Sequence, residues 1–282
     1  MSRGQLDKSD WERINGSLPN LGYIRNTIGS LTPEILSFLF HPNSYIPVAS
    51  VCFKDVLASL NGAAHALSEA FAHQIWYLEK TNPPDELGAI YFRKYYLDDA
   101  ALRLYSAGEH LADGILMMME IDKSALKIKG SSKQIKLGNY LITQKSEHPV
   151  SRIVDELAHS TIWLQTLKYR NDWVHEQPPL ITGLGIAYNR KIRWKTSPQG
   201  NGIAMNGIGD IPEFSVEDLE AFIRPSAIIF HKVFLGIIKY YLELLKSYGF
   251  TVTDKEYSSA ISVNFKTINR PKWWDEKSIK VD

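Results

Sequence analysis

The chain has 282 residues, a length typical of one large domain or of two smaller ones, and its composition of 44% hydrophobic and 22% charged residues excludes a wholly disordered protein. Lysine and arginine together number 32 against 31 aspartates and glutamates, so the net charge of +1 excludes a global field that attracts nucleic acid or membranes. The single cysteine, Cys52, excludes an internal disulfide and is typical of a reducing compartment. With no signal sequence in residues 1–15, we expect a cytoplasmic protein.

Residues 1–46 are predicted to form an N-terminal arm with one short helix. This helix begins at Thr32, which is followed by a first-turn proline and an acidic residue, and it ends before Pro42. Two long amphipathic helices come next. Apolar positions recur every three to four residues from Phe53 to Leu78 and again from Leu97 to Met118.

The middle of the chain predicts shorter elements. Residues 122–144 are polar and rich in lysine, which indicates a loop and a short helix. A helical period then runs from Pro149 to about Val174 and stops before Pro178. This predicted helix carries the residues that are most informative about function.

Residues 178–214 have a different pattern, with glycines, turns and an alternating stretch that together favour a small β-hairpin insertion. A last long helix is predicted from about 215 to 248, because Ser215 and Asp218 form a capping-box-like pair in front of an apolar period. Its apolar stretch is interrupted by charged residues, so we expect a buried helix and no membrane partner. Residues 250–282 are expected to be a C-terminal tail.

Together these elements predict an all-α fold, an antiparallel helical bundle over residues 47–249 that contains the β-hairpin insertion. A metal-binding bundle is one alternative, but only Glu156 and His159 have the Glu-x-x-His spacing of such sites. No glycine-rich phosphate loop is present, and Cys52 lies on the apolar side of its helix. We expect neither a metal nor a cofactor.

The segment that ends the helix predicted from Pro149 contains the string Arg170-Asn171-x-x-x-His175. A looser spacing, Arg followed by four to six residues and His, also occurs three more times in the chain. For the stricter string, this composition gives a chance expectation of about 0.01. The three looser pairs, which we interpret as solvated or packing pairs, are Arg103 with His110, Arg152 with His159, and Arg224 with His231.

An Arg-Asn-x-x-x-His string that ends a helix in an all-α chain resembles the HEPN superfamily of bundle-forming domains associated with nucleotides and RNA. The resemblance covers the helical core, roughly residues 47–177 and 215–249. It implies a HEPN-like bundle, a nucleotide or RNA partner, and a C2 homodimer in which the Arg and His of two protomers meet in one cleft.

Helix geometry indicates why such a site needs two protomers. At 100° per residue, Arg170 points about 140° away from His175, so we expect that one helix alone does not aim both side chains at one phosphate. Asn171 and His175 lie one turn apart.

The residues of this string suit a metal-independent ribonuclease. His175 is able to take up or give a proton near neutral pH, and Arg170 is able to stabilise negative charge on phosphorus with its two-pronged guanidinium. Asn171 is expected to orient His175 or to close the free carbonyls at the helix end. The alternative is a non-catalytic dimerisation or protein-interaction module in which these residues only complement the helix dipole.

Two further groups are candidate substrate-binding residues. Glu109 and Asp113 lie one turn apart, and an acid here is placed to pair with Arg170 across the bundle. In the predicted hairpin, basic residues flank an aromatic one, a combination that holds backbone phosphate and stacks a base. A charged strand edge that prevents aggregation explains the same pattern. The hairpin residues are Arg190, Lys191, Arg193 and Trp194.

Overall fold

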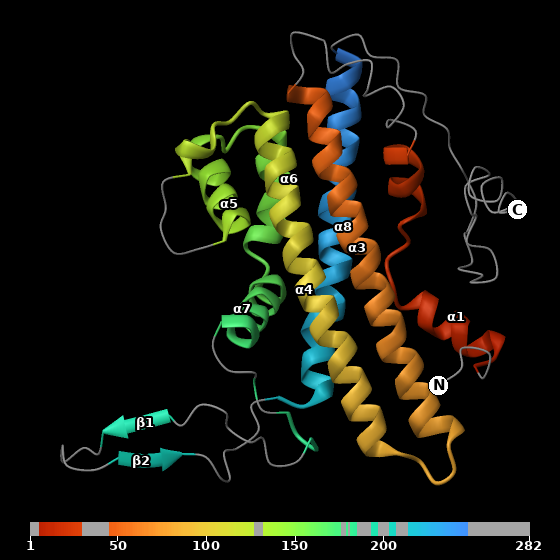
Figure 1. The fold of residues 1–282 in the computed structure, drawn as a ribbon. Coiled ribbons are helices and arrows are strands. Elements are labelled where there is room, and N and C mark those ends of the chain that lie inside the picture. The colour runs from red at the N-terminus through yellow and green to blue at the C-terminus, as the bar shows by residue number, and fades with distance from the viewer. Residues whose placement is uncertain are drawn as a thin grey trace, which may run out of the picture.

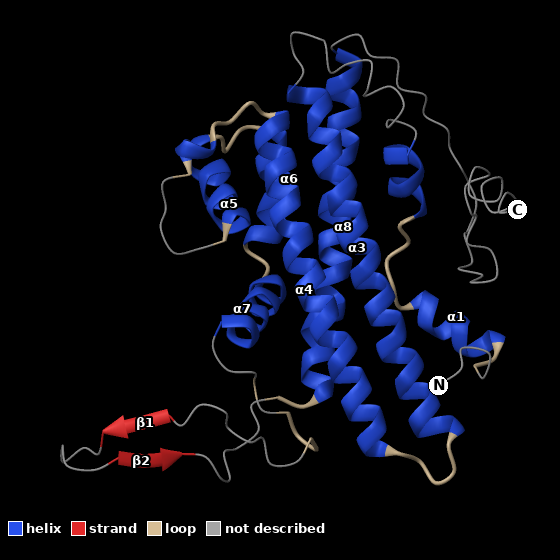
Figure 2. Cartoon of the chain, viewed as in Figure 1, coloured by secondary structure: helices blue, strands red, loops and turns tan. Residues whose placement is uncertain are grey.

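The computed structural model describes residues 6–29, 45–126, 132–175, 179, 181–184, 193–196, 203–206 and 214–247. Eight α-helices in this part of the chain pack together, so the prediction of an all-α fold is confirmed (Figures 1 and 2). The helices are α1 (Lys8–Gly16), a segment at residues 22–29, α3 (Tyr45–Ile75), α4 (Glu86–Met118), α5 (Lys133–Gln144), α6 (Pro149–Ala158), α7 (Thr161–His175) and α8 (Val216–Ser247).

Shorter elements connect these helices. A π-helical turn, Trp76–Lys80, ends α3, and a 3-10 turn, Lys123–Ala125, follows α4. Two strands, β1 (Arg193–Thr196) and β2 (Ile203–Asn206), pair antiparallel in the segment where the sequence predicts a hairpin (Figure 2). The short helix predicted to begin at Thr32 and the tail at 250–282 lie outside the described residues.

The two long helices α3 and α4 form an antiparallel hairpin, and α8 packs against both (Figure 1). The α4 helix begins where the Asp85 side chain accepts a hydrogen bond from the backbone N–H of Gly88 at 2.8 Å. The α8 helix runs antiparallel to α3 but in the same direction as α4, because the chain returns through α5–α7 to the end at which α4 starts. The bundle is therefore not antiparallel throughout.

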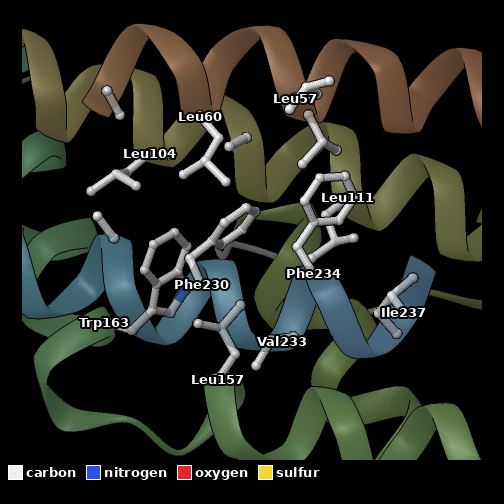
Figure 3. Packing of buried hydrophobic residues seen from close by; sticks show 14 of the residues in the cluster. Leu57, Leu60, Leu104, Leu111, Leu157, Trp163, Phe230, Val233, Phe234 and Ile237 are labelled. Atoms are coloured by element: carbon white, nitrogen blue, oxygen red, sulfur yellow. The ribbon is translucent and has the colours of Figure 1, made fainter. Parts of the chain in front are cut away.

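The core lies where α3, α4 and α8 meet α6 and α7. Leucines of α3 and α4 face the aromatic residues of α8 across this space (Figure 3). Trp163 at the start of α7 is almost fully buried and stacks on Phe230 of α8, with 5.2 Å between the ring centroids. This contact brings α7 onto the bundle and sets the position of its C-terminal half.

The prediction of one continuous helix from Pro149 to about Val174 is wrong, because the structure has two helices here, α6 and α7. The break lies at His159 and Ser160, and the Ser160 hydroxyl accepts a hydrogen bond from the backbone N–H of Trp163 at 3.2 Å. Ser160 thus caps a new helix at a point where the apolar period continues, so the periodicity alone does not reveal the break. Because of this break, the direction of the α7 side chains is not set by the axis of α6.

The prediction for α8 is confirmed at its start. The Ser215 hydroxyl accepts from the backbone N–H of Asp218 at 3.0 Å, and the Asp218 carboxylate accepts from the N–H of Ser215 at 2.8 Å. This helix is long and apolar enough to cross a membrane, with a mean hydropathy of 1.6 over its most apolar window, but half of that window is buried inside the bundle. Burial of this kind is typical of a core helix.

Two helical glycines provide a test of α3–α4 packing. A Cβ added to Gly114 lies 2.4 Å from the buried ring of Phe53, whereas a Cβ added to Gly62 meets only the flexible end of Arg103. We expect Gly114→Ala to lower the free energy of unfolding by about 1–3 kcal/mol through overpacking. Gly62→Ala, the matched control, should leave it unchanged or raise it by up to about 1 kcal/mol through helix propensity. Chemical denaturation measures both values, and a stabilising Gly114→Ala would contradict the packing.

Candidate functional site

The C-terminal half of α7 is attached to α4 by a buried hydrogen bond. The Tyr169 hydroxyl donates to Oδ1 of Asp98 at 2.5 Å, and Nζ of Lys94 lies 2.5 Å from Oδ2 of the same carboxylate. Burial raises the pKa of Asp98, although Lys94 and the Tyr169 hydroxyl oppose this shift. Burial and the Asp98 carboxylate also raise the pKa of Tyr169 far above its usual range, so the hydroxyl stays protonated as a donor.

Arg170, the next residue, lies over an aromatic ring of α4. The Arg170 guanidinium carbon is 3.9 Å from the centroid of the Tyr105 ring, which is a cation–π contact. Tyr105 follows Asp98 by two helical turns, so both residues lie on the face of α4 that meets α7. The sequence indicated Tyr105 only as part of the apolar stripe of its helix, and nothing in its spacing connected it with Arg170.

The Arg170 guanidinium also reaches the other two residues of the string. Its Nη1 donates to Oδ1 of Asn171 at 3.0 Å and lies 3.2 Å from Nε2 of His175. The expectation that one helix does not bring Arg170 and His175 together is therefore wrong. Helix geometry gives the direction of each Cβ, but the long arginine side chain bends over Tyr105 and covers the angular difference.

This contact has a consequence for the protons of the site. A guanidinium only donates hydrogen bonds, so Nε2 of His175 must be the acceptor. In this arrangement, the neutral imidazole carries its hydrogen on Nδ1. For Nε2 to take up a proton, Arg170 has to release it.

Arg170 differs from other arginines of the bundle in its charge environment. Among the described residues, no carboxylate lies within ion-pair distance of its guanidinium, and its Nε is buried without a hydrogen-bond partner. The arginines of the three looser pairs each have a carboxylate partner. These ion pairs are Arg103 with Asp99 at 2.9 Å, Arg152 with Glu147 at 3.4 Å, and Arg224 with Glu220 at 3.7 Å. Among the four pairs, the stricter string therefore contains the arginine that has no carboxylate partner in the described part of the chain.

The prediction of an ion pair between Arg170 and Glu109 or Asp113 of α4 is wrong. Glu109 accepts a hydrogen bond from the backbone N–H of Gln134 at 3.2 Å, and Asp113 pairs with Lys133 at 2.5 Å and with Lys123 at 3.1 Å. Both acids thus hold α5 and the loop before it. Burial and the nearby Glu109 carboxylate raise the pKa of Tyr105, whereas Arg170 lowers it.

The remaining candidates are the residues of the predicted hairpin and of the Glu-x-x-His spacing. Arg190 and Lys191 are outside the described residues, and of Arg193 and Trp194 the structure describes only the backbone in β1. Within the described part of the chain, no three His, Cys, Asp or Glu side chains are grouped to hold a metal ion. His159 pairs with Asp155 at 2.8 Å, and Glu156 pairs with Lys232 at 2.6 Å.

The surroundings of Cys52 in the described part of the chain do not favour its thiolate. Its sulfur lies 3.8 Å from that of Met117, and burial raises the pKa of the thiol. A thiol with a raised pKa is a poor nucleophile.

Comparison with known proteins gives no match: no family model, no curated protein and no solved structure is similar to this chain. The resemblance to HEPN domains therefore stays a prediction from the Arg170-Asn171-x-x-x-His175 string.

Replacement of Tyr105 tests whether its ring positions Arg170. In Tyr105→Leu, the guanidinium loses its aromatic support, worth about 0.5–2 kcal/mol, and should leave Nε2 of His175. Nitrogen NMR of the imidazole at a pH of about 8.5, where histidines are neutral, should show the Nδ1–H form in the wild type and a tautomer mixture in Tyr105→Leu. Tyr105→Phe, which keeps the ring, is the matched control and should match the wild type. An unchanged tautomer in Tyr105→Leu would show that the ring has no such role.

Proposed function

We propose that this chain is a HEPN-like protein that binds the phosphate of RNA or of a nucleotide at Arg170, with His175 beside it. One observation carries the proposal. Among the described residues, the Arg170 guanidinium has no carboxylate partner, and it is held 3.2 Å from an exposed histidine. A preoriented cation without a carboxylate partner suits an anion with several acceptor oxygens.

The arrangement also supports a metal-independent cleavage of RNA. In this reaction, the ribose 2′-oxygen bonds to the adjacent phosphorus while its proton passes to Nε2 of His175. The bond from phosphorus to the 5′-oxygen breaks, the leaving oxygen takes up a proton from water, and a 2′,3′-cyclic phosphate remains. Because Arg170 donates to Nε2 in the unliganded chain, transfer of the guanidinium to the phosphate is the step that frees His175 as a base.

Asn171 has a positioning role in this proposal. Its side-chain oxygen accepts from Nη1 of Arg170 at 3.0 Å, so it restrains the guanidinium on the side that faces His175. The candidate substrate-binding residues Glu109, Arg190, Lys191, Arg193 and Trp194 remain predictions.

Loss of the Arg170 charge should weaken phosphate binding. We expect Arg170→Gln to reduce the affinity for a labelled single-stranded RNA about 10- to 100-fold, because a hydrogen bond to a charged group contributes about 1.5–3 kcal/mol. Fluorescence anisotropy measures the dissociation constant, and a nucleoside monophosphate as competitor separates nucleotide from RNA binding. In the control Arg152→Gln, which removes a carboxylate-paired arginine, the affinity should be unchanged. Equal effects of the two substitutions would contradict a specific site.

Loss of His175 should separate chemistry from binding. We expect His175→Ala to abolish RNA cleavage in the presence of EDTA and to cost about 1 kcal/mol or less in stability, since this side chain is exposed at the end of α7. Gel analysis should show wild-type products with 2′,3′-cyclic phosphate ends. If the wild type binds RNA but leaves it uncut, the site is a binding site only.

The second candidate is a non-catalytic homodimerisation module, and the outer face of α4 favours it. Leu87, Tyr91 and Tyr95 are spaced one turn apart and are 60%, 57% and 61% exposed. An apolar stripe of this kind is typical of an interface. Light scattering at micromolar concentration should then give a dimer in the wild type and a monomer in Tyr91→Glu, while a monomeric wild type would exclude this candidate.

A further inference from the structure

A cavity of about 380 Å³ lies between residues 15–25 and α3. This segment packs on the side of the α3–α4 hairpin that faces away from α7, so the cavity is separate from the Arg170 site (Figure 1). Its volume falls within the range of small-molecule sites, roughly 300–1,000 Å³.

The walls of the cavity are held in place by polar contacts and by the core. Nη2 of Arg25 donates to Oδ1 of Asn61 on α3 at 2.9 Å, and the His231 imidazole of α8 hydrogen-bonds the backbone of Asn20. Leu21 and Ile24, which flank this part of the chain, are buried in the main core. Contacts within the chain therefore hold the cavity walls, and binding needs little rearrangement.

The lining of the cavity carries one permanent positive charge among the described residues. Arg25 lines it and is held by a neutral amide, and none of the described residues that line the cavity is an aspartate or glutamate. His65 and Ser68 add polar groups from the same face of α3. Beside this face, the Glu69 carboxylate lies 4.0 Å from Nδ1 of His65, and its side chain is 93% buried.

Part of the lining is apolar. Leu18, Leu21 and Ala64 contribute aliphatic side chains, and Pro19 adds to this surface. A ligand that fits this lining has one negatively charged group near Arg25 and a compact apolar body.

We propose that this cavity binds a small organic anion with a single carboxylate or phosphate group. The guanidinium of Arg25 holds the charged group, and its Asn61 partner fixes the guanidinium at the cavity wall. The aliphatic residues of the lining contact the ligand body, and a neutral ligand of the same shape lacks the attraction to the guanidinium.

Calorimetric titration of the full chain with benzoate and with phenyl phosphate tests this site. The Arg170→Gln substitution is included throughout, so the outcome does not depend on the function proposed for α7. We expect saturable binding of at least one probe and at least a tenfold loss of affinity in Arg25→Gln. Binding by one probe alone identifies the charged group, and benzyl alcohol should not bind.

Two controls separate the site from general effects. Arg152→Gln removes an arginine outside the cavity and should leave the affinity unchanged. Ala64→Leu fills the aliphatic part of the cavity without a change of charge and should also abolish binding, which covers the case in which Arg25→Gln fails to fold. The absence of saturable binding by both probes, or equal affinity in the wild-type cavity and Ala64→Leu, would overturn the proposal.

Discussion

The contact between Arg170 and the ring of Tyr105 is the constraint on which the proposed site depends. An arginine near the end of a helix ordinarily extends into solvent, where it keeps its rotamer entropy. Here the centroid of the Tyr105 ring lies 3.9 Å from the guanidinium carbon of Arg170, and the bent arginine side chain reaches Nε2 of His175. The hydrogen bond of Tyr169 to Asp98 keeps α7 at the distance that this contact needs. A core interaction thereby sets the geometry of a partly exposed site.

Charge distribution explains why this arginine differs from others. The buried Arg93 is neutralised by Glu217 at 2.6 Å and Glu220 at 2.8 Å, as a buried cation requires. Arg170 is half-buried and has no such partner among the described residues. The carbonyl end of α7 compensates part of its charge through the helix dipole, which amounts to about half an elementary charge. A phosphate can supply the remaining compensation.

Several features of the fold could be predicted because they depend on local chemistry. The three- to four-residue period reveals the long helices, and Ser215 with Asp218 marks the start of α8 through hydrogen bonds between near neighbours. The break between α6 and α7 could not be predicted, since the apolar period continues through Ser160. The contact of Arg170 with His175 also escaped prediction, because it depends on a ring that lies 65 positions earlier in the chain. A helical projection gives the direction in which a side chain leaves its helix. It gives neither the reach of that side chain nor its contacts with another helix.

The most direct test of the central claim is nitrogen–proton NMR of the Arg170 Nε–H group during titration with inorganic phosphate. This group belongs to the guanidinium and has no acceptor among the described residues, so an anion bound at the guanidinium should shift its resonance saturably. The Nε–H resonance of Arg93, which is neutralised by two carboxylates, should stay in place. An Arg170 resonance that does not move at saturating phosphate, or one that moves only as far as that of Arg93, would contradict an anion site at Arg170.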